Sequence, residues 1–181
     1  MGVRFHDSLH VTHRKLRIVE LAVSELLLDD GAHDRPDARL GRLLQRAVDD
    51  SGLVRDQLYV TNAVKHFRFV ARGKRRIHAT PEMAHIVACR PWLVAELREV
   101  DPRIVVVLGA TAAKSLLGAQ FKVTRHRGEV ITIDTTHGPR QFVPTVHPSS
   151  VLRVPEPDRP AAYDGLVAGL RVVARAVRDG A

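Results

Sequence analysis

Residues Arg103–Gly118, RIVVVLGATAAKSLLG, decide the fold class of this chain. The run Ile104–Leu108 is short, continuously apolar and mostly β-branched, and such runs form strands that are buried on both faces. Gly109 then predicts a tight turn into a helix that starts near Thr111. A strand of this kind followed at once by a helix is typical of a parallel sheet covered by helices.

The segments on either side of this stretch continue the alternation of strand and helix. YVTN within Asp56–Val64 and QFVPTV before His147 are short, β-branched and predict strands. Apolar residues at helical spacing predict helices before Gly52, which would be the C-cap, and over Asp158–Arg178. We therefore expect an α/β fold with three α/β/α layers and a central, mainly parallel sheet.

Two segments leave more room for interpretation. Leu16–Leu28 is so densely apolar that it fits either a helix or a strand followed by a helix. In the segment from 79 to 100, Thr80 is the expected N-cap and Pro81 the first helical residue. Pro91 lacks an N–H group, so it should kink or divide that helix.

Polar residues follow three of the expected strands, in TNAVKH, LGAT and HPSS. Ligands of open parallel sheets bind at the carboxyl ends of the strands, so these residues should share one edge. The Asn62 carboxamide can donate to and accept from the edge of a base, or it can simply cap a turn. His147 can donate to a developing oxyanion, or it can hold the loop that we expect after it.

The positive charge of the chain is concentrated in one segment. The formal net charge is +8, and Lys65–Arg76 contains six basic residues and no acid, which fits either a phosphate-binding edge or a solvated loop. The single cysteine excludes an internal disulfide and suits a reducing cytoplasm. No apolar run is long enough to span a bilayer, and the first residues lack the pattern of a secretory signal.

Several motifs occur in an order that resembles a known family. They are YVTNAVKHF, GKRRIH, ACRPWLVAEL, VVVLGATAAKSLLG, FKVTRHRGEV and VHPSSVLR. Together they resemble the UdgX group of the uracil-DNA glycosylase superfamily, relatives of family 4, from about Leu43 to the end. The resemblance implies a uracil-DNA glycosylase-like domain over residues 37–181, preceded by a divergent segment, residues 1–36.

The resemblance also implies roles for particular residues. Asn62 falls on the uracil-reading Asn of the family, and His147 on the His that stabilises the departing uracil anion. His78, the last residue of KRRIH, falls on the His that attacks the sugar and stays bonded to the DNA. A neutral imidazole is a competent nucleophile near pH 7. Further contacts are implied to the substrate by Arg76, Ser149 and Arg153, and to the DNA backbone by Lys65, Lys74 and Arg75.

The relatives bind a four-iron [4Fe-4S] cluster, and the resemblance places two of its four ligands here. Cys89 matches the last cysteine of the pattern, and His66 stands where family 4 has its third cysteine. The CxxC pair of the relatives is missing, and so are their GEQPG-like pocket motif and the Phe after it. We therefore expect this chain alone to hold a cluster poorly.

The expected function is excision of uracil from single-stranded DNA by a monomer, with covalent capture through His78. A hydrolytic uracil-DNA glycosylase is the first alternative, and a non-catalytic DNA-binding remnant is the second. A gene product that does not fold stably is the third. The missing motifs would be explained by a divergent start, a frameshift or a misplaced start codon. The first strand is then either absent from the sheet or replaced by Leu16–Val23.

Overall fold

The computed structural model describes the backbone of residues 18–22, 36–65, 69–72, 75–136 and 138–179, and side chains within 39–65, 69–70, 79–136 and 138–179. Its centre is a five-stranded sheet in the order β2-β1-β5-β7-β6. The strands are β1 (Ile18–Ala22), β2 (Leu58–Asn62), β5 (Ile104–Leu108), β6 (Ile131–Thr135) and β7 (Gly138–Thr145). The strands β2, β1, β5 and β7 are parallel to one another, and β6 pairs antiparallel with β7. The mainly parallel sheet is thus confirmed.

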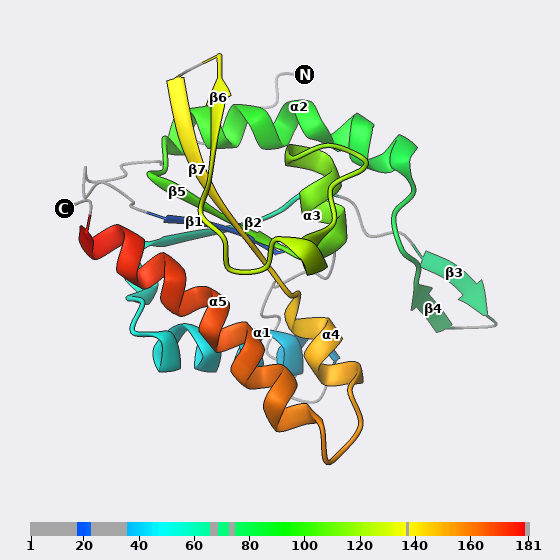
Figure 1. The fold of residues 1–181 in the computed structure, drawn as a ribbon. Coiled ribbons are helices and arrows are strands. Elements are labelled where there is room, and N and C mark those ends of the chain that lie inside the picture. The colour runs from blue at the N-terminus through cyan, green and yellow to red at the C-terminus, as the bar shows by residue number, and fades with distance from the viewer. Residues whose placement is uncertain (1–17, 23–35, 66–68, 73–74, 137, 180–181) are drawn as a thin grey trace, which may run out of the picture.

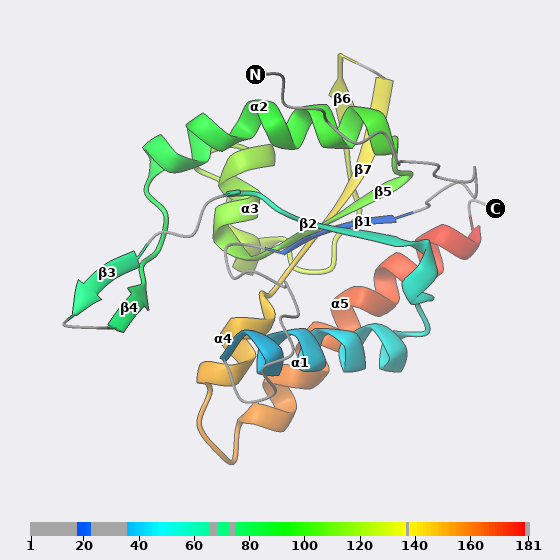
Figure 2. The ribbon, with the colours of Figure 1, turned by 180° about the vertical axis from the view of Figure 1, so that it is seen from behind.

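Helices cover both faces of the sheet and complete the three layers (Figure 1). One face carries α1 (Pro36–Ser51), α4 (Pro148–Arg153) and α5 (Arg159–Asp179), which contact one another. The opposite face carries α2 (Met83–Val100) and α3 (Gly109–Leu116), as the view from behind also shows (Figure 2). Two short 3-10 turns, Arg55–Gln57 and Val123–Arg125, complete the list of described helical segments.

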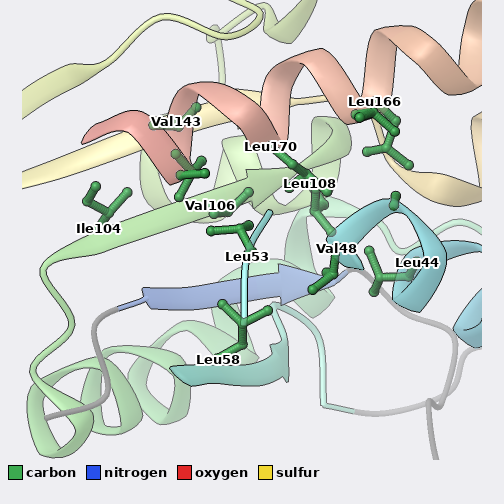
Figure 3. Close-up of a cluster of buried hydrophobic side chains, with 14 of the residues drawn as sticks. Leu44, Val48, Leu53, Leu58, Ile104, Val106, Leu108, Val143, Leu166 and Leu170 are labelled. Atoms are coloured by element: carbon green, nitrogen blue, oxygen red, sulfur yellow. The ribbon is translucent and has the colours of Figure 1, made fainter. Parts of the chain in front are cut away.

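Strand β5 is the centre of the core, as its sequence predicts. All five of its residues are buried, and they alternate between two apolar clusters. Ile104, Val106 and Leu108 face α1 and α5, where Leu166 and Leu170 pack on them (Figure 3). Val105 and Val107 face α2 and α3. Burial of each such side chain contributes roughly 1.5–3 kcal/mol, so β5 anchors both helical layers.

The segment with two possible interpretations contains a strand. Ile18–Ala22 forms β1, which lies between β2 and β5 and pairs with both of them in parallel. Ile18–Ala22 therefore belongs to the same sheet as the strands of the later part of the chain. The helix considered for the second half of Leu16–Leu28 lies outside the described residues.

The segment from 79 to 100 starts differently from the prediction, and its helix is not divided. Glu82 is the N-cap of α2, not Thr80, and its side chain accepts from the backbone of His85 in a capping box. Pro81 precedes the helix. Pro91 lies inside α2, which runs on to Val100 as one helix. The lost backbone hydrogen bond of Pro91 does not divide it, because buried Ile86, Leu93 and Leu97 hold α2 on the sheet.

Two other elements differ from the prediction. Helix α3 begins at Gly109 itself, whose φ of +80° makes the turn directly at the strand end. The residues after His147 form the short helix α4, where a loop was expected. His147 is its N-cap and Pro148 its first residue, a position that suits a residue without an N–H group. Gly52, at φ +78°, ends α1 as predicted.

The basic segment contains a two-stranded ribbon. β3 (Phe69–Arg72) pairs antiparallel with β4 (Arg75–His78), and Phe69 stands opposite His78. This ribbon lies away from the main sheet, beyond the N-terminal end of α2 (Figures 1 and 2). It follows closely after β2, so the basic segment leaves the body at the carboxyl edge of the sheet.

Candidate active site

The carboxyl ends of the parallel strands form one row across the sheet. Asn62 at the end of β2 is the partner of Ala22 in β1, and Leu108 at the end of β5 is the partner of Thr145 in β7. Leu21 pairs with Val107, so the next residues, Ala22 and Leu108, also lie side by side. The predicted meeting of the strand endings at one edge is confirmed. Neighbouring strands are about 4.8 Å apart, which puts roughly 14 Å between the backbones of β2 and β7.

Asn62 and Thr145 belong to the same face of the sheet. Leu58 and Val60 pack in the cluster under α1 and α5, and side chains two residues apart share a face, so Asn62 continues that row. Thr145 faces α5, since a Cβ added to Gly169 would come within 2.8 Å of the Thr145 Cβ. The space between these two strand ends is therefore bounded by the α1 and α5 side of the sheet.

The Asn62 carboxamide has an unused hydrogen-bonding atom. Its Oδ1 is buried, and it has no hydrogen-bond partner among the described residues. A buried polar atom left unsatisfied costs about 1–3 kcal/mol, so such an atom at a strand end is suited to receive a ligand group. The oxygen and nitrogen of the amide are assigned positions, and either one offers a ligand a polar contact there.

Thr145 offers a second buried polar atom on the same row. Its Oγ1 also lacks a hydrogen-bond partner in the described part of the chain. Sequence reasoning missed Thr145, because a threonine in a β-branched strand is indistinguishable from an ordinary strand residue. The signal would have been its place two residues before His147, on the strand that ends at the same edge.

His147 is held in one protonation pattern by its own helix. Its Nδ1 accepts from the backbone N–H of Ser149 at 3.1 Å and lies 2.7 Å from the Ser149 hydroxyl. A backbone N–H can only donate, so Nδ1 is the unprotonated ring nitrogen and Nε2 carries the proton of the neutral imidazole. The ring can therefore donate a hydrogen bond from Nε2, as stabilisation of an anion requires.

Gly109 sets the position of His147 relative to β5. A Cβ added to Gly109 would lie only 2.9 Å from the Cβ of His147. The backbone at the end of β5 and the first atom of the His147 side chain are thus in direct contact, and only glycine leaves room there. Sequence reasoning used Gly109 as a turn signal and missed this contact.

Ser149 and Arg153 were both expected at the substrate; in the structure Ser149 contacts His147, and Arg153 contacts Ser149. Arg153 Nη1 donates to the Ser149 hydroxyl at 3.2 Å. That hydroxyl can then donate its own proton to His147 Nδ1. These hydrogen bonds hold the Nδ1 side of the neutral His147 ring in place. Direct contact of either residue with a substrate stays a prediction.

Lys65 is not a free surface cation in this fold. Its ammonium lies 2.6 Å from Glu96 Oε2 and donates to the Thr61 hydroxyl at 2.7 Å. Side-chain exposure is 20% for Lys65 and 32% for Glu96, so the pair is partly shielded from water. The predicted contact of Lys65 with the DNA backbone remains untested, and its charge is already balanced.

The other expected nucleic-acid residues lie on the ribbon. Arg75, Arg76 and His78 belong to β4, for which the structure describes the backbone only. Lys74 and His66 lie outside the described residues. The backbone trace does not place His78 at the row of strand ends, and its role stays a prediction.

The donor set around Cys89 does not fit a four-iron cluster. Cys89 is the single cysteine of the sequence, it is buried with Val64 and Ile86, and its Sγ accepts from the Lys65 backbone N–H at 3.4 Å. Within the described residues, no three His, Cys, Asp or Glu side chains gather as metal ligands. Such clusters are held by four ligands, usually thiolates, so we derive no step through one.

None of the described helices is both long and apolar enough to cross a bilayer. Within those same residues, the row of strand ends is the place where unsatisfied polar atoms and an oriented histidine come together.

Comparison with known proteins agrees with this geometry. Residues 27–171 match the uracil DNA glycosylase superfamily. The chain is similar to the type-4 uracil-DNA glycosylase of Thermotoga maritima, 34% identical over 116 residues, which are 64% of this chain and 55% of the relative. It is also similar to the type-4 enzymes of Sulfurisphaera tokodaii, 31% identical over 120 residues, and Archaeoglobus fulgidus, 28% over 120 residues.

These matches cover 64% of this chain and 51% and 57% of the last two relatives. The chain thus spans about half the length of the curated relatives it matches. The superfamily match itself runs through β2, the row of strand ends and most of α5. By the extent of that match, this chain belongs to the uracil DNA glycosylase superfamily.

Proposed function

We propose that this protein excises uracil from single-stranded DNA and becomes covalently linked to the DNA through His78. The observation that carries the excision step is the buried Asn62 Oδ1, which has no hydrogen-bond partner in the described part of the chain and lies on the same edge of the sheet as the oriented His147. A carboxamide that can pair with the edge of a base and a donor for an anion are the two groups that this reaction needs. The relatives named above are type-4 uracil-DNA glycosylases, which supports the same substrate.

The bond-breaking step follows from these two residues. A uracil flipped out of the strand is bound by Asn62, and its N-glycosidic bond stretches toward cleavage. The bonding electron pair leaves with N1 of uracil, and negative charge spreads to the uracil oxygens. The Nε2–H of His147 donates to that charge, so it binds the transition state more tightly than the substrate.

The covalent step is assigned to His78 on the resemblance of GKRRIH to the UdgX group. The lone pair of the neutral imidazole attacks C1′ of the sugar, while C1′ parts from N1. The imidazolium formed then loses its ring proton to solvent, and the uracil anion takes up a proton. The net exchange links His78 to the sugar and releases neutral uracil, with no further reactant.

The basic ribbon supplies the contacts to the strand in this proposal. Lys74, Arg75 and Arg76 lie within or next to β4, in a segment without an acidic residue. Their charges would bind phosphates on either side of the flipped nucleotide. Cytoplasmic location and a monomeric state belong to the same proposal, the first supported by the single cysteine.

A denaturing gel tests the covalent step. The protein is mixed with a labelled single-stranded oligonucleotide that carries one uracil, and the sample is boiled in detergent. A shifted band that requires uracil and is missing from His78→Ala supports the proposal. His78→Ala should still release uracil, with water attacking C1′ in place of the imidazole, since Asn62 and His147 are intact.

The same gel separates the alternative functions. Free abasic DNA without a shifted band indicates a hydrolytic glycosylase, which the type-4 relatives favour. Untouched DNA from a folded sample, shown by a cooperative melt, contradicts both enzymatic functions and indicates a DNA-binding remnant.

A further inference from the structure

A ring of three hydrogen-bonded side chains lies beside Asn62 and is not used by the proposed mechanism. The Thr61 hydroxyl donates to Glu96 Oε2 at 2.6 Å, and the Lys65 ammonium lies 2.6 Å from the same oxygen and 2.7 Å from the hydroxyl. One carboxylate oxygen of α2 thus receives two short bonds from the end of β2. Charge-assisted bonds of this length are about twice as strong as neutral ones.

This ring encloses the segment that carries Asn62. Thr61 directly precedes Asn62, and Lys65 follows it by three residues. Between them, Ala63 and Val64 are buried. The Lys65 backbone N–H also donates to the Sγ of Cys89, which lies about two helical turns before Glu96 on α2. The end of β2 is therefore tied to a single helix on both sides of Asn62.

The two faces of β2 have different roles: one faces α2, and the other carries Asn62. Tyr59 packs in the cluster on the α2 side, and alternation puts Thr61 on that side and Asn62 on the other. Burial, and then the charge of Glu96, raise the pKa of Tyr59 above its usual value. Glu96 holds the strand from the face that does not meet the ligand.

We propose that Glu96 is a positioning residue, which fixes the Asn62 carboxamide through Thr61 and Lys65. The proposal rests on the proposed function of Asn62 as the residue that reads uracil. In this arrangement Lys65 helps to hold Asn62 in position and does not bind a phosphate. A misplacement of a reacting group by about 1 Å costs about a hundredfold in rate, so the ring has a measurable effect.

Glu96→Gln tests the proposal, because it keeps the shape of the side chain and removes its charge. We expect the single-turnover rate of uracil release at saturating oligonucleotide to fall about tenfold or more, with the half-saturating concentration unchanged. Glu99→Gln, three residues further along the same helix and exposed to solvent, is the matched control and should keep the wild-type rate. Equal rates in Glu96→Gln and Glu99→Gln would overturn the proposal.

A double-mutant cycle separates positioning from stability. If Glu96 acts through Asn62, then Glu96→Gln adds no further loss of rate to Asn62→Ala. A merely structural role would lower the rate by the same factor in both backgrounds. Glu96→Asp, which keeps the charge, should recover part of the rate.

Two further measurements do not depend on catalysis. In Glu96→Gln, amide hydrogen exchange should rise in peptides that cover 58–65 and stay unchanged over Ile104–Leu108. Wild-type protein without excision activity would contradict the proposed function, and this exchange pattern would still decide the role of Glu96.

Lys65→Met should leave the salt dependence of DNA binding unchanged. A slope reduced by about 0.7 would show that Lys65 contacts a phosphate, and would overturn the assignment.

Discussion

Single residues at the carboxyl edge of the sheet are constrained by contacts that their types do not reveal. Gly109 is a turn residue by its sequence, and its φ of +80° is one that side chains rarely adopt. The same residue touches the Cβ of His147, so it also sets the place of the anion-stabilising ring. One glycine thus serves both the backbone and the site.

Gly109→Ala should therefore damage both stability and activity. The strained φ costs about 1–3 kcal/mol, and the new Cβ must push His147 away because it would lie 2.9 Å from the His147 Cβ. We expect a lower denaturation midpoint and a rate of uracil release reduced tenfold or more.

Gly52→Ala is the control for this prediction. Gly52 has a similar φ of +78°, but a Cβ added there meets nothing within 4 Å. The Gly52→Ala variant should lose a similar amount of stability in urea unfolding, and the folded variant should keep the wild-type rate of uracil release. Equal losses of rate in the two variants would show that strain alone is responsible.

At the scale of elements, the layer of α1 and α5 is joined by one polar cluster. The Tyr163 hydroxyl of α5 donates to Asp50 Oδ2 of α1 at 2.6 Å, and the Arg46 guanidinium lies over the Tyr163 ring at 4.9 Å. Arg171 also donates to the Asp50 carbonyl at 3.2 Å. These contacts fix how α1 packs against α5.

Tyr163→Phe should weaken this junction in a pH-dependent way. The variant keeps the ring and its cation–π contact, and it loses one hydrogen bond, which costs about 1 kcal/mol. Burial, and then the bond to Asp50, raise the pKa of Tyr163 to about 12. A raised pKa means that the contribution is full below pH 10 and is lost as the pH rises toward 12.

Urea unfolding of both proteins checks this prediction. The difference between wild type and Tyr163→Phe should be constant from pH 7 to about pH 9 and should shrink above pH 10. A difference that keeps its size at pH 11 would contradict the assigned bond.

At the scale of the whole molecule, a cluster of basic residues lies apart from the main sheet and its helices. The ribbon of β3 and β4 lies away from the sheet, and the segment that contains it has six basic residues without an acid. Because α1, α2 and α5 all carry acidic residues, the ribbon is the part of the chain with the most one-sided charge.

Replacement of Lys74 and Arg75 by Ser should weaken binding of single-stranded DNA and flatten its salt dependence. Each lost phosphate contact lowers the slope of log K against log salt by about 0.7, so we expect a decrease of about 1.4. Thermal stability should stay unchanged, since the ribbon lies outside both large apolar clusters.

The double replacement Arg175→Ser and Arg178→Ser is the matched control. It removes the same net charge from the exposed side of α5. An equal change of slope in the control would mean that overall charge, and not the ribbon, binds the strand.

Local pattern determined much of this protein. The apolar run of β5, the helical stripe of α5 and the turn-forming ends of β2 and β7 predict the fold class and the edge of the sheet on which both Asn62 and His147 lie. Each of these signals is contained in a few consecutive residues, because strand and helix periodicities are properties of neighbours along the chain. Family resemblance then assigned chemistry to the histidines.

Other features were decided only by tertiary structure. β1 has its place because β2 and β5 offer it two parallel edges, and α2 continues through Pro91 because its buried side chains hold it to the sheet. Lys65 pairs with Glu96, 31 residues away, a partner that the sequence around Lys65 does not indicate. Such partners are chosen by packing between distant segments, and local sequence carries no record of that distance.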